Sequence, residues 1–403
     1  MKKLIPFLCV FAYFMSPYRL GGHEMPEIMG ILSLLFVIMN RPSVSFDKRY
    51  MFYMSYMWVI PPLCALECGI PGNYLVAVIP VALILTSCYL CILLPSVDKG
   101  RVLYYYRMLV YVAVSFFIIQ ELSVALLGYR PTMYIPFLEM YYKGSDAASF
   151  AASRAEMERS SSFFLEPSHF AQYILPYFCI ILSKYVSSRK GLFEVLFMTA
   201  IILILRAGIG YVTLLTIGSF FFIKSDYLKL YQRIIIVLAG FLGFLFLTTV
   251  YANTEFVSDI LDRTSEFSME VNAHGKQSGF IRIWRGYFIY GAMDLINQIF
   301  GVGISGLEYV CNAIFIPGCR YEGTYMNGIQ SLLVTGGLVG CCLFLNFIFS
   351  LIKKLDITGQ CILVAMLTIF FMEHMLYTQK MFLYILLACC FVKDIKNNLT
   401  LVK

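Results

Sequence analysis

Residues 331–352 read SLLVTGGLVGCCLFLNFIFSLI, without one charged side chain. A helix needs about 20 apolar residues to cross the hydrocarbon core of a bilayer, and this stretch has that length. Residues 74–94 and 108–127 are two further long apolar stretches. Backbone groups cannot stay unpaired in lipid, so stretches of this kind predict membrane-spanning helices. A membrane barrel would instead alternate apolar and polar residues, and these stretches do not.

The composition of the whole chain points the same way. Hydrophobic residues make up 60% of the 403 residues, charged residues make up 14%, and the mean hydropathy is +0.77. One soluble core cannot bury that many apolar side chains. We therefore predict an all-α fold, a single integral membrane domain over residues 1–403 built as a polytopic bundle of about 12 helices. The first predicted segment follows Lys2 and Lys3 and is read as a retained helix, because no small-residue cleavage site follows it. The predicted segments are 4–17, 27–40, 51–67, 74–94, 108–127, 168–183, 192–205, 208–223, 234–251, 328–352, 360–375 and 381–392.

Basic residues separate the two sides of the predicted bundle. Short cytoplasmic connections of membrane proteins collect lysine and arginine. If both termini are cytoplasmic, every inward connection is basic, for example through Arg49, Lys99, Arg189, Lys224 and Lys354. The formal net charge of +7 is then mostly a topology signal, and it gives no indication of nucleic-acid binding.

Two long polar stretches, residues 128–166 and 252–327, fall on the outward side as large loops. Topology leaves their basic residues unexplained, although long translocated loops tolerate positive charge. These residues are Arg130, Lys143, Arg154 and Arg159 in the first loop, and Arg263, Lys276, Arg282, Arg285 and Arg320 in the second.

Residues 280–300 of the second loop are predicted to form an interfacial helix. One narrow arc of that helix would face lipid, formed by Trp284, Phe288, Ala292, Leu295 and Ile299. Arg282 and Arg285 would then stand at headgroup depth, where guanidinium groups can hold phosphate or pyrophosphate oxygens. Alternatively, they only pair with lipid headgroups. The FGVGISG at 300–306 lacks the flanking strand and helix of a dinucleotide fold, so no cofactor is expected.

Polar residues at the mouth of the predicted bundle are further candidates. Glu166 precedes Pro167 at a helix start, where the helix dipole favours a carboxylate. Its alternative role is that of a general base or an anchor for a substrate hydroxyl. His169 lies one turn into the helix and either packs or touches substrate. Glu373 and His374 form either an interfacial polar cap or a wall of the active site.

Histidine and cysteine positions bear on metals and disulfides. The four histidines show no spacing with carboxylates or cysteines that suits a metal site, so no metal is expected. Cys311 and Cys319 share the second outward loop, where an oxidising compartment would permit a bridge. The pairing stays open, because Cα atoms more than about 7 Å apart forbid the bond.

Three segments together resemble a known family. RSSSFFLEPSHFAQY at 159–173, SGFIRIWRGY at 278–287 and YMNGIQSLLVTGGLVGCCLFL at 325–345 are similar to segments of the O-antigen and exopolysaccharide polymerases (Wzy) of bacterial inner membranes. The resemblance extends to the architecture, including two large periplasmic loops. It implies a glycosyltransferase C-like helical fold. It also implies that the chain joins oligosaccharide repeat units carried on undecaprenyl diphosphate.

The resemblance also assigns roles to residues. Arg282 matches the family's arginine before a loop tryptophan, here Trp284, and Arg159 matches the arginine before the first motif. The implied reaction transfers a growing glycan from its lipid diphosphate to a hydroxyl of an incoming unit. We expect Glu166 to act on that hydroxyl, and Arg282 and Arg285 to stabilise the leaving diphosphate. The candidate substrate-binding residues are Arg159, His169, Trp284, Asn327 and His374.

Two other functions stay open. O-antigen ligases share the second-loop pattern but usually place a histidine before the asparagine at this helix start, where this chain has Met326 before Asn327. A lipid-linked oligosaccharide flippase is also a helical bundle, but transporters tend to carry ionisable groups at mid-membrane and internal repeats, which this sequence does not show. Expected partners are the undecaprenyl-diphosphate-linked oligosaccharide, membrane lipids, a chain-length regulator and a flippase, with no nucleic acid. The expected location is the bacterial inner membrane, with a periplasmic active site.

Overall fold

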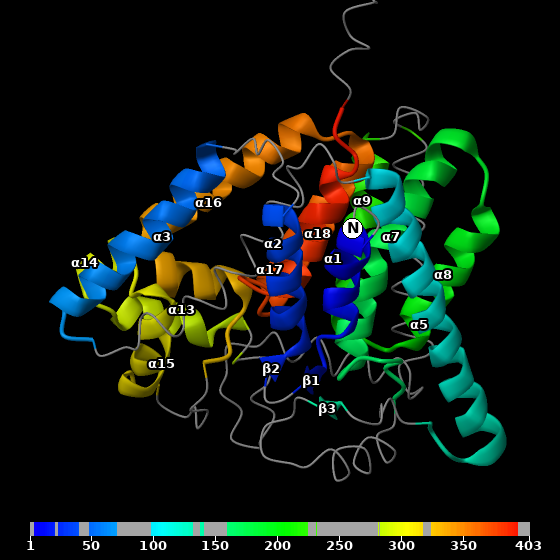
Figure 1. The fold of residues 1–403 in the computed structure, drawn as a ribbon, viewed down its shortest axis with the longest axis horizontal. Coiled ribbons are helices and arrows are strands. Elements are labelled where there is room, and N and C mark those ends of the chain that lie inside the picture. The colour runs from blue at the N-terminus through cyan, green and yellow to red at the C-terminus, as the bar shows by residue number, and fades with distance from the viewer. Residues whose placement is uncertain are drawn as a thin grey trace, which may run out of the picture.

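The computed structural model describes residues 4–20, 23–39, 48–70, 98–131, 138–140, 159–224, 231, 281, 283–316 and 324–393. These residues are predominantly helical, which confirms the all-α fold class (Figure 1). The helices are α1 Leu4–Phe14, α2 Met25–Met39, α3 Lys48–Glu67, α5 Lys99–Leu127, α7 Pro167–Ser188, α8 Leu192–Ile204, α9 Gly208–Lys224, α13 Arg285–Ala292, α14 Leu295–Phe300, α15 Gly303–Ala313, α16 Gly328–Lys354, α17 Ile357–Met372 and α18 Gln379–Cys389.

Each predicted apolar segment within these residues corresponds to a helix, and segments 74–94 and 234–251 lie outside the described residues. The limits differ most at α5, which begins at Lys99 rather than at residue 108. Asp98 causes this earlier start, because its side chain accepts a hydrogen bond from the backbone N–H of Arg101 at 3.2 Å and caps the helix. α5 ends at Leu127 and α7 begins at Pro167, on either side of the first polar loop.

A small antiparallel sheet, which the sequence did not predict, joins the N-terminal region to the first polar loop. β1 (Tyr18–Leu20) pairs with β2 (His23–Glu24) on one side and with β3 (Glu139–Met140) on the other. The strands are too short to show an alternating pattern, and the partners of β1 and β3 are far apart in the chain. Figure 1 places the sheet at the lower end of the molecule.

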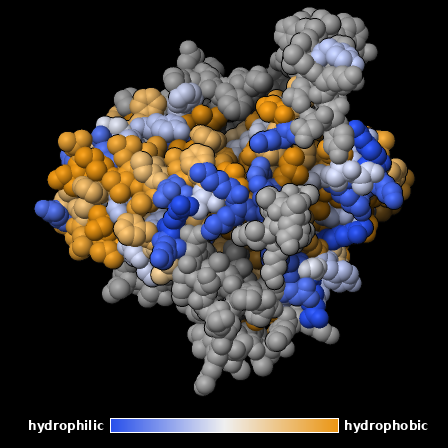
Figure 2. Space-filling model, turned by 90° about the horizontal axis from the view of Figure 1, so that it is seen from above, coloured by the Kyte–Doolittle hydropathy of each residue, from blue (hydrophilic) through white to orange (hydrophobic). Residues whose placement is uncertain are grey.

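Two of the described helices, α5 and α16, are long and apolar enough to cross a membrane, and the other apolar helices are shorter. Large apolar side chains nevertheless point outward from several helices. Leu126 of α5, Phe193 of α8 and Leu215 of α9 are 79%, 82% and 73% exposed. Figure 2 shows the molecule from above, with hydrophobic residues over much of its left part. Soluble monomers rarely expose so much apolar surface, whereas a lipid environment accommodates it.

Backbone hydrogen bonds identify the two opposite ends of the helices α16 and α17. At one end, the backbone N–H of Lys393 donates to the carbonyl of Lys354 at 3.0 Å, which joins the exit of α18 to the α16–α17 turn. At the other end, the N–H of Gly328 donates to the carbonyl of Glu373 at 2.9 Å, which joins the start of α16 to the end of α17. Lys354 and Lys393 therefore lie on the same side, as the basic pattern requires.

α16 is bent, although its sequence was read as one continuous segment. Gly337 has φ +63° and ψ −169°, which interrupts the helix. The α14–α15 turn packs into the interruption, where the N–H of Val302 donates to the carbonyl of Val334 at 3.0 Å. The hydroxyl of Tyr56, from α3, donates to the carbonyl of Gly336 at 2.9 Å. The carbonyls that the bend releases are thus satisfied by neighbouring elements, as a kinked helix in an apolar environment requires.

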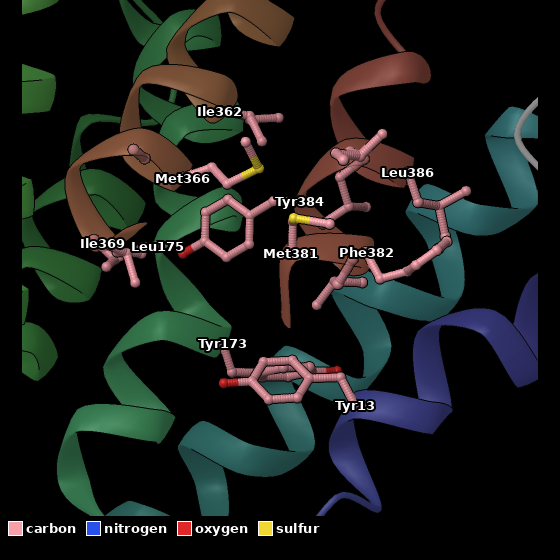
Figure 3. Packing of buried hydrophobic residues seen from close by; sticks show 14 of the residues in the cluster. Tyr13, Tyr173, Leu175, Ile362, Met366, Ile369, Met381, Phe382, Tyr384 and Leu386 are labelled. Atoms are coloured by element: carbon pink, nitrogen blue, oxygen red, sulfur yellow. The ribbon is translucent and has the colours of Figure 1, made fainter. Parts of the chain in front are cut away.

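Aromatic residues fill the core between α1, α7, α17 and α18. Figure 3 shows Tyr13, Tyr173 and Tyr384 in this cluster, and the rings of Tyr13 and Tyr173 lie 5.4 Å apart. Pro176 lies inside α7 and lacks the N–H that would bond to the carbonyl of Gln172. The hydroxyl of Tyr384 donates to that carbonyl instead, at 2.7 Å. Because Pro176 leaves this carbonyl without a partner in α7, the carbonyl can form a hydrogen bond that links α7 to α18.

Candidate active site

A buried carboxylate lies where α7, α17 and α18 meet. Glu373 follows α17 and is 5% exposed. Its Oε1 accepts a hydrogen bond from Nζ of Lys380 at 2.9 Å and lies 3.0 Å from Nε2 of His169. Its Oε2 accepts a hydrogen bond from Nε2 of Gln172. These four residues form one polar group, which we call the Glu373 centre.

Local sequence explains why α7 contributes two side chains. Pro167 occupies the first turn, where a missing N–H costs nothing, so the helix starts just before His169. His169 and Gln172 are three positions apart and therefore share one face of the helix. The hydroxyl of Tyr13, from α1, donates to the backbone carbonyl of His169 at 3.1 Å. The start of α7 is thus held by this hydrogen bond from α1 as well as by its own proline.

The backbone of Glu373 connects the centre to α16. Its N–H donates to the carbonyl of Ile369 and closes α17, while its own carbonyl accepts from Gly328. A side chain at position 328 would bring its Cβ to 2.4 Å from the ring of Phe370. Only glycine lets the start of α16 approach this closely.

Charge within the centre is balanced by pairing. Burial opposes the charge on Glu373, but Lys380 and His169 outweigh it and hold the pKa of this carboxyl well below its usual range. Glu373 is therefore ionised at neutral pH. A buried carboxylate needs such partners, because an isolated charge in the interior is very costly.

Asn327 and His374, both predicted to bind substrate, meet at the start of α16. The side chain of Asn327 accepts from the N–H of Gln330 at 2.9 Å, and Gln330 Oε1 accepts from the N–H of Asn327 at 3.3 Å, which completes a capping box. Nδ1 of His374 lies 3.2 Å from the hydroxyl of Ser331. The ring of His374 also hydrogen-bonds to the backbone of Met326. A histidine thus stands beside Met326 in space, although none precedes Asn327 in sequence.

His374 is neutral at physiological pH. Burial and the positive charge of Lys380 lower its pKa to about 4, against the opposing effect of Glu373. A neutral imidazole can accept a proton or a hydrogen bond, but it does not attract an anion.

Arg285, expected at headgroup depth from the sequence, is buried within the protein. Its side chain is 2% exposed, and its guanidinium donates to the backbone carbonyls of Tyr325 and Cys311, each at 3.4 Å. α15 and the segment before α16 cover it. Cys311 is buried beside Arg285, and Cys319, its predicted disulfide partner, lies outside the described residues.

The predicted interfacial helix over residues 280–300 is divided, because α13 ends at Ala292 and α14 begins at Leu295. The amide of Gln298 donates to the carbonyl of Met293 at 2.8 Å, which satisfies backbone freed by the division. Phe288 and Leu295 are exposed, as an interfacial arc requires, whereas Trp284 is half-buried and contacts Tyr287. Gly286 packs against Gln330, whose amide donates to the carbonyl of Ile283.

The remaining predicted residues are Arg159, Glu166 and Arg282, and none of them is one of the four residues of the Glu373 centre. Arg159 donates to the backbone carbonyl of Arg206, in the α8–α9 turn, at 3.0 Å. Glu166 is exposed at the start of α7 and accepts from the hydroxyl of Ser168 at 3.0 Å. Arg282 lies outside the described residues, so its geometry is not part of this site.

Gln172 and Lys380 belong to the centre and were missed in the sequence. Gln172 could have been found from its position three residues after His169, on the same helical face. Lys380 could have been noticed as a cation near Glu373 in an otherwise apolar region of the chain. Glu373 was recognised, but its role was left open.

Among the described residues, no group of three histidine, cysteine, aspartate or glutamate side chains could hold a metal ion. Comparison of the chain with protein-family models, with curated proteins and with solved structures gives no match.

Proposed function

We propose that the chain is a glycosyltransferase of the bacterial inner membrane that joins undecaprenyl-diphosphate-linked oligosaccharide units into a surface polysaccharide. In this proposal the chain spans the membrane about 12 times, both termini are cytoplasmic, and the active site is periplasmic. The basic end that contains Lys354 and Lys393 then faces the cytoplasm. The Glu373 centre lies at the opposite end of the helices.

One observation carries the proposal: the three segments that resemble the polymerases converge on the start of α16. This start belongs to the segment 325–345. The N–H of Gly328 bonds to Glu373, which holds His169 of the segment 159–173. Gln330 bonds to the carbonyl of Ile283, in the segment 278–287. The first of these segments is more than 100 residues from the other two, yet all three meet at the start of α16, which is the arrangement expected of an active site.

The proposed reaction makes two chemical demands. The leaving diphosphate must be stabilised as charge develops on it, and the acceptor hydroxyl must lose its proton. We assign the first task to arginines of the outward loops, with Arg282 foremost and Arg159 as a binding residue. The Glu373 centre supports the second. Two lipid-anchored substrates held at one membrane depth also lose little further entropy when they react.

Deletion of the gene in its host tests the proposal. Gel analysis of the surface polysaccharide should show loss of long chains, with a single repeat unit still attached to the acceptor. Loss of all attached glycan would indicate a ligase or a flippase instead. Unchanged chain lengths would contradict any role in polymer assembly.

A further inference from the structure

His169 and Glu373 form an oriented histidine–carboxylate pair. Nε2 of His169 lies 3.0 Å from Glu373 Oε1, which accepts a proton but cannot donate one while it is ionised. The ring therefore carries its hydrogen on Nε2 and presents Nδ1 as the basic nitrogen. Nδ1 has no hydrogen-bond partner among the described residues, and the side chain of His169 is 24% exposed. The ring is thus partly open to the surroundings.

Lys380 and Gln172 hold the carboxylate in place. Lys380 Nζ shares Oε1 with His169, while Gln172 bonds to Oε2. The carboxylate therefore cannot rotate away from the imidazole without breaking other hydrogen bonds. In other enzymes, a carboxylate bound in this way selects the histidine tautomer and stabilises the imidazolium that forms during proton transfer.

One buried polar atom of the centre lacks a hydrogen-bond partner. Gln172 is fully buried, and its Oε1 has no partner among the described residues. A buried acceptor without a hydrogen bond is unfavourable, and most buried polar groups avoid this state. Such an exception calls for an explanation, and a catalytic role is one that fits this position.

We propose that His169 is the general base of the transfer reaction. Glu373 and Lys380 are positioning residues: Glu373 orients the imidazole, and Lys380 compensates the charge of Glu373. This inference rests on the proposed function and deepens it by naming the group that acts on the acceptor sugar. The ligand class at Nδ1 is the free hydroxyl of a lipid-linked oligosaccharide. His169 replaces the exposed Glu166, which the sequence favoured for this task.

The proposed transfer step needs no further reactant, because each proton and electron pair has a defined destination. The acceptor hydroxyl gives its proton to Nδ1, and its oxygen forms the new glycosidic bond to the anomeric carbon of the donor glycan. The bond between that carbon and the diphosphate oxygen breaks, and its electron pair leaves with undecaprenyl diphosphate. The imidazolium then releases its proton to water before the next transfer.

Titratable groups near His169 come from each element that meets it. Among the described residues they are Glu166 and Tyr13, which contact the backbone of His169, and Glu373 with its partner Lys380. His374 follows Glu373 in the chain. Of these side chains, Glu373 is the one that hydrogen-bonds to the ring.

The test uses the purified full-length chain in lipid nanodiscs, with lipid-linked repeat units extracted from the deletion host as substrate. His169→Gln keeps an amide that can donate to Glu373 but removes the basic nitrogen, and we expect it to slow the transfer by about 100-fold or more. His23→Gln, in the small sheet, is the matched control and should transfer at the wild-type rate. Melting temperatures establish that each variant is folded.

The pH profile separates a base from a structural ion pair. We expect the wild-type rate to fall toward acidic pH, and His169→Gln to lose this acid limb. The double variant Glu373→Gln with Lys380→Gln removes both charges together, so neither is left unpaired. Without these partners the imidazole is no longer held in place, so we expect the double variant to transfer more slowly than the wild type.

The outcomes distinguish the two proposals. If the wild-type chain leaves the repeat units unjoined, the proposed function fails. If the wild type joins them and His169→Gln does so equally fast, or keeps the wild-type acid limb, only the role of His169 fails. If the double variant transfers at the wild-type rate, the positioning role of Glu373 and Lys380 fails.

Discussion

The backbone of Gly337 packs directly against the carbonyl of Ile299. A Cβ at position 337 would lie 2.3 Å from that oxygen, far inside van der Waals contact. Reciprocally, a Cβ at Gly301 would lie 2.3 Å from the carbonyl oxygen of Thr335. The bend in α16 and the α14–α15 turn therefore fit each other through two glycines, and this contact holds α16 against α14 and α15.

Gly337→Ala should destabilise the protein strongly. The backbone at position 337 is in a region essentially restricted to glycine, and occupying it with alanine costs about 1–3 kcal/mol before the clash is counted. Thermal unfolding in nanodiscs measures the effect. Gly218→Ala is the control, because this exposed glycine of α9 has nothing within 4 Å of an added Cβ. Equal melting temperatures for the two variants would contradict the packed bend.

Lys380→Met should destabilise the Glu373 centre, whereas Lys380→Arg should be tolerated better. Removing one partner of a buried ion pair leaves the other charge uncompensated, which costs about 3–5 kcal/mol. Lys353→Met, at an exposed position near the opposite end, should change stability little. Chemical unfolding of the three variants tests this. A Lys380→Met variant as stable as wild type would show that Glu373 does not depend on Lys380.

The contribution of Glu373 to stability should depend on pH with a defined sign. Its folded-state pKa is depressed, so the unfolded chain takes up the proton first as the pH falls. The stabilisation is therefore fully present above the ordinary carboxyl pKa of about 4.3 and is lost progressively below it. Wild type and Glu373→Gln should differ less in stability at pH 3 than at pH 7, by an amount that unfolding curves at about these two pH values measure. A constant difference would exclude an ionised Glu373.

Arg282→Lys should reduce polymerisation, whereas Arg285→Lys should reduce stability. If Arg282 holds a diphosphate through its planar fork, lysine keeps the charge but loses most polymerisation, without loss of stability. If it only meets lipid headgroups, a contact worth about 1 kcal/mol and governed by charge, lysine serves nearly as well. Arg285 spans two backbone carbonyls in the interior, so Arg285→Lys should lower the melting temperature. Polymer length at matched membrane abundance, together with melting curves, separates these cases.

Reporter fusions test the topology. Fusions after Lys229 and Lys354 should report cytoplasm, and fusions after Lys143 and Lys276 should report periplasm, because short basic connections stay inside. The structure adds a constraint: Lys354 and Lys393 are hydrogen-bonded through their backbones, so fusions after these two residues must report the same side. Opposite reports from this pair would contradict the fold itself.

The sequence by itself determined the helices, and it predicts the sidedness of the chain. Both depend on local properties: an apolar stretch of sufficient length forms a helix in lipid, and lysine or arginine at its end marks the cytoplasmic side. The helix start at Pro167 and the cap at Asn327 could likewise be read locally, from a proline and an asparagine at the right positions.

Tertiary structure alone decided the composition of the site. His169 and Glu373 are 204 positions apart, and no local pattern indicates which carboxylate a histidine will meet. The exposure of Glu166, the burial of Arg285 and the bend at Gly337 also depend on elements that are distant in the chain. Hydropathy is a property of neighbouring residues, whereas a hydrogen bond between side chains requires a specific packing of whole helices. That packing is why α7, α17 and α18 build one polar centre that the sequence showed only as separate residues.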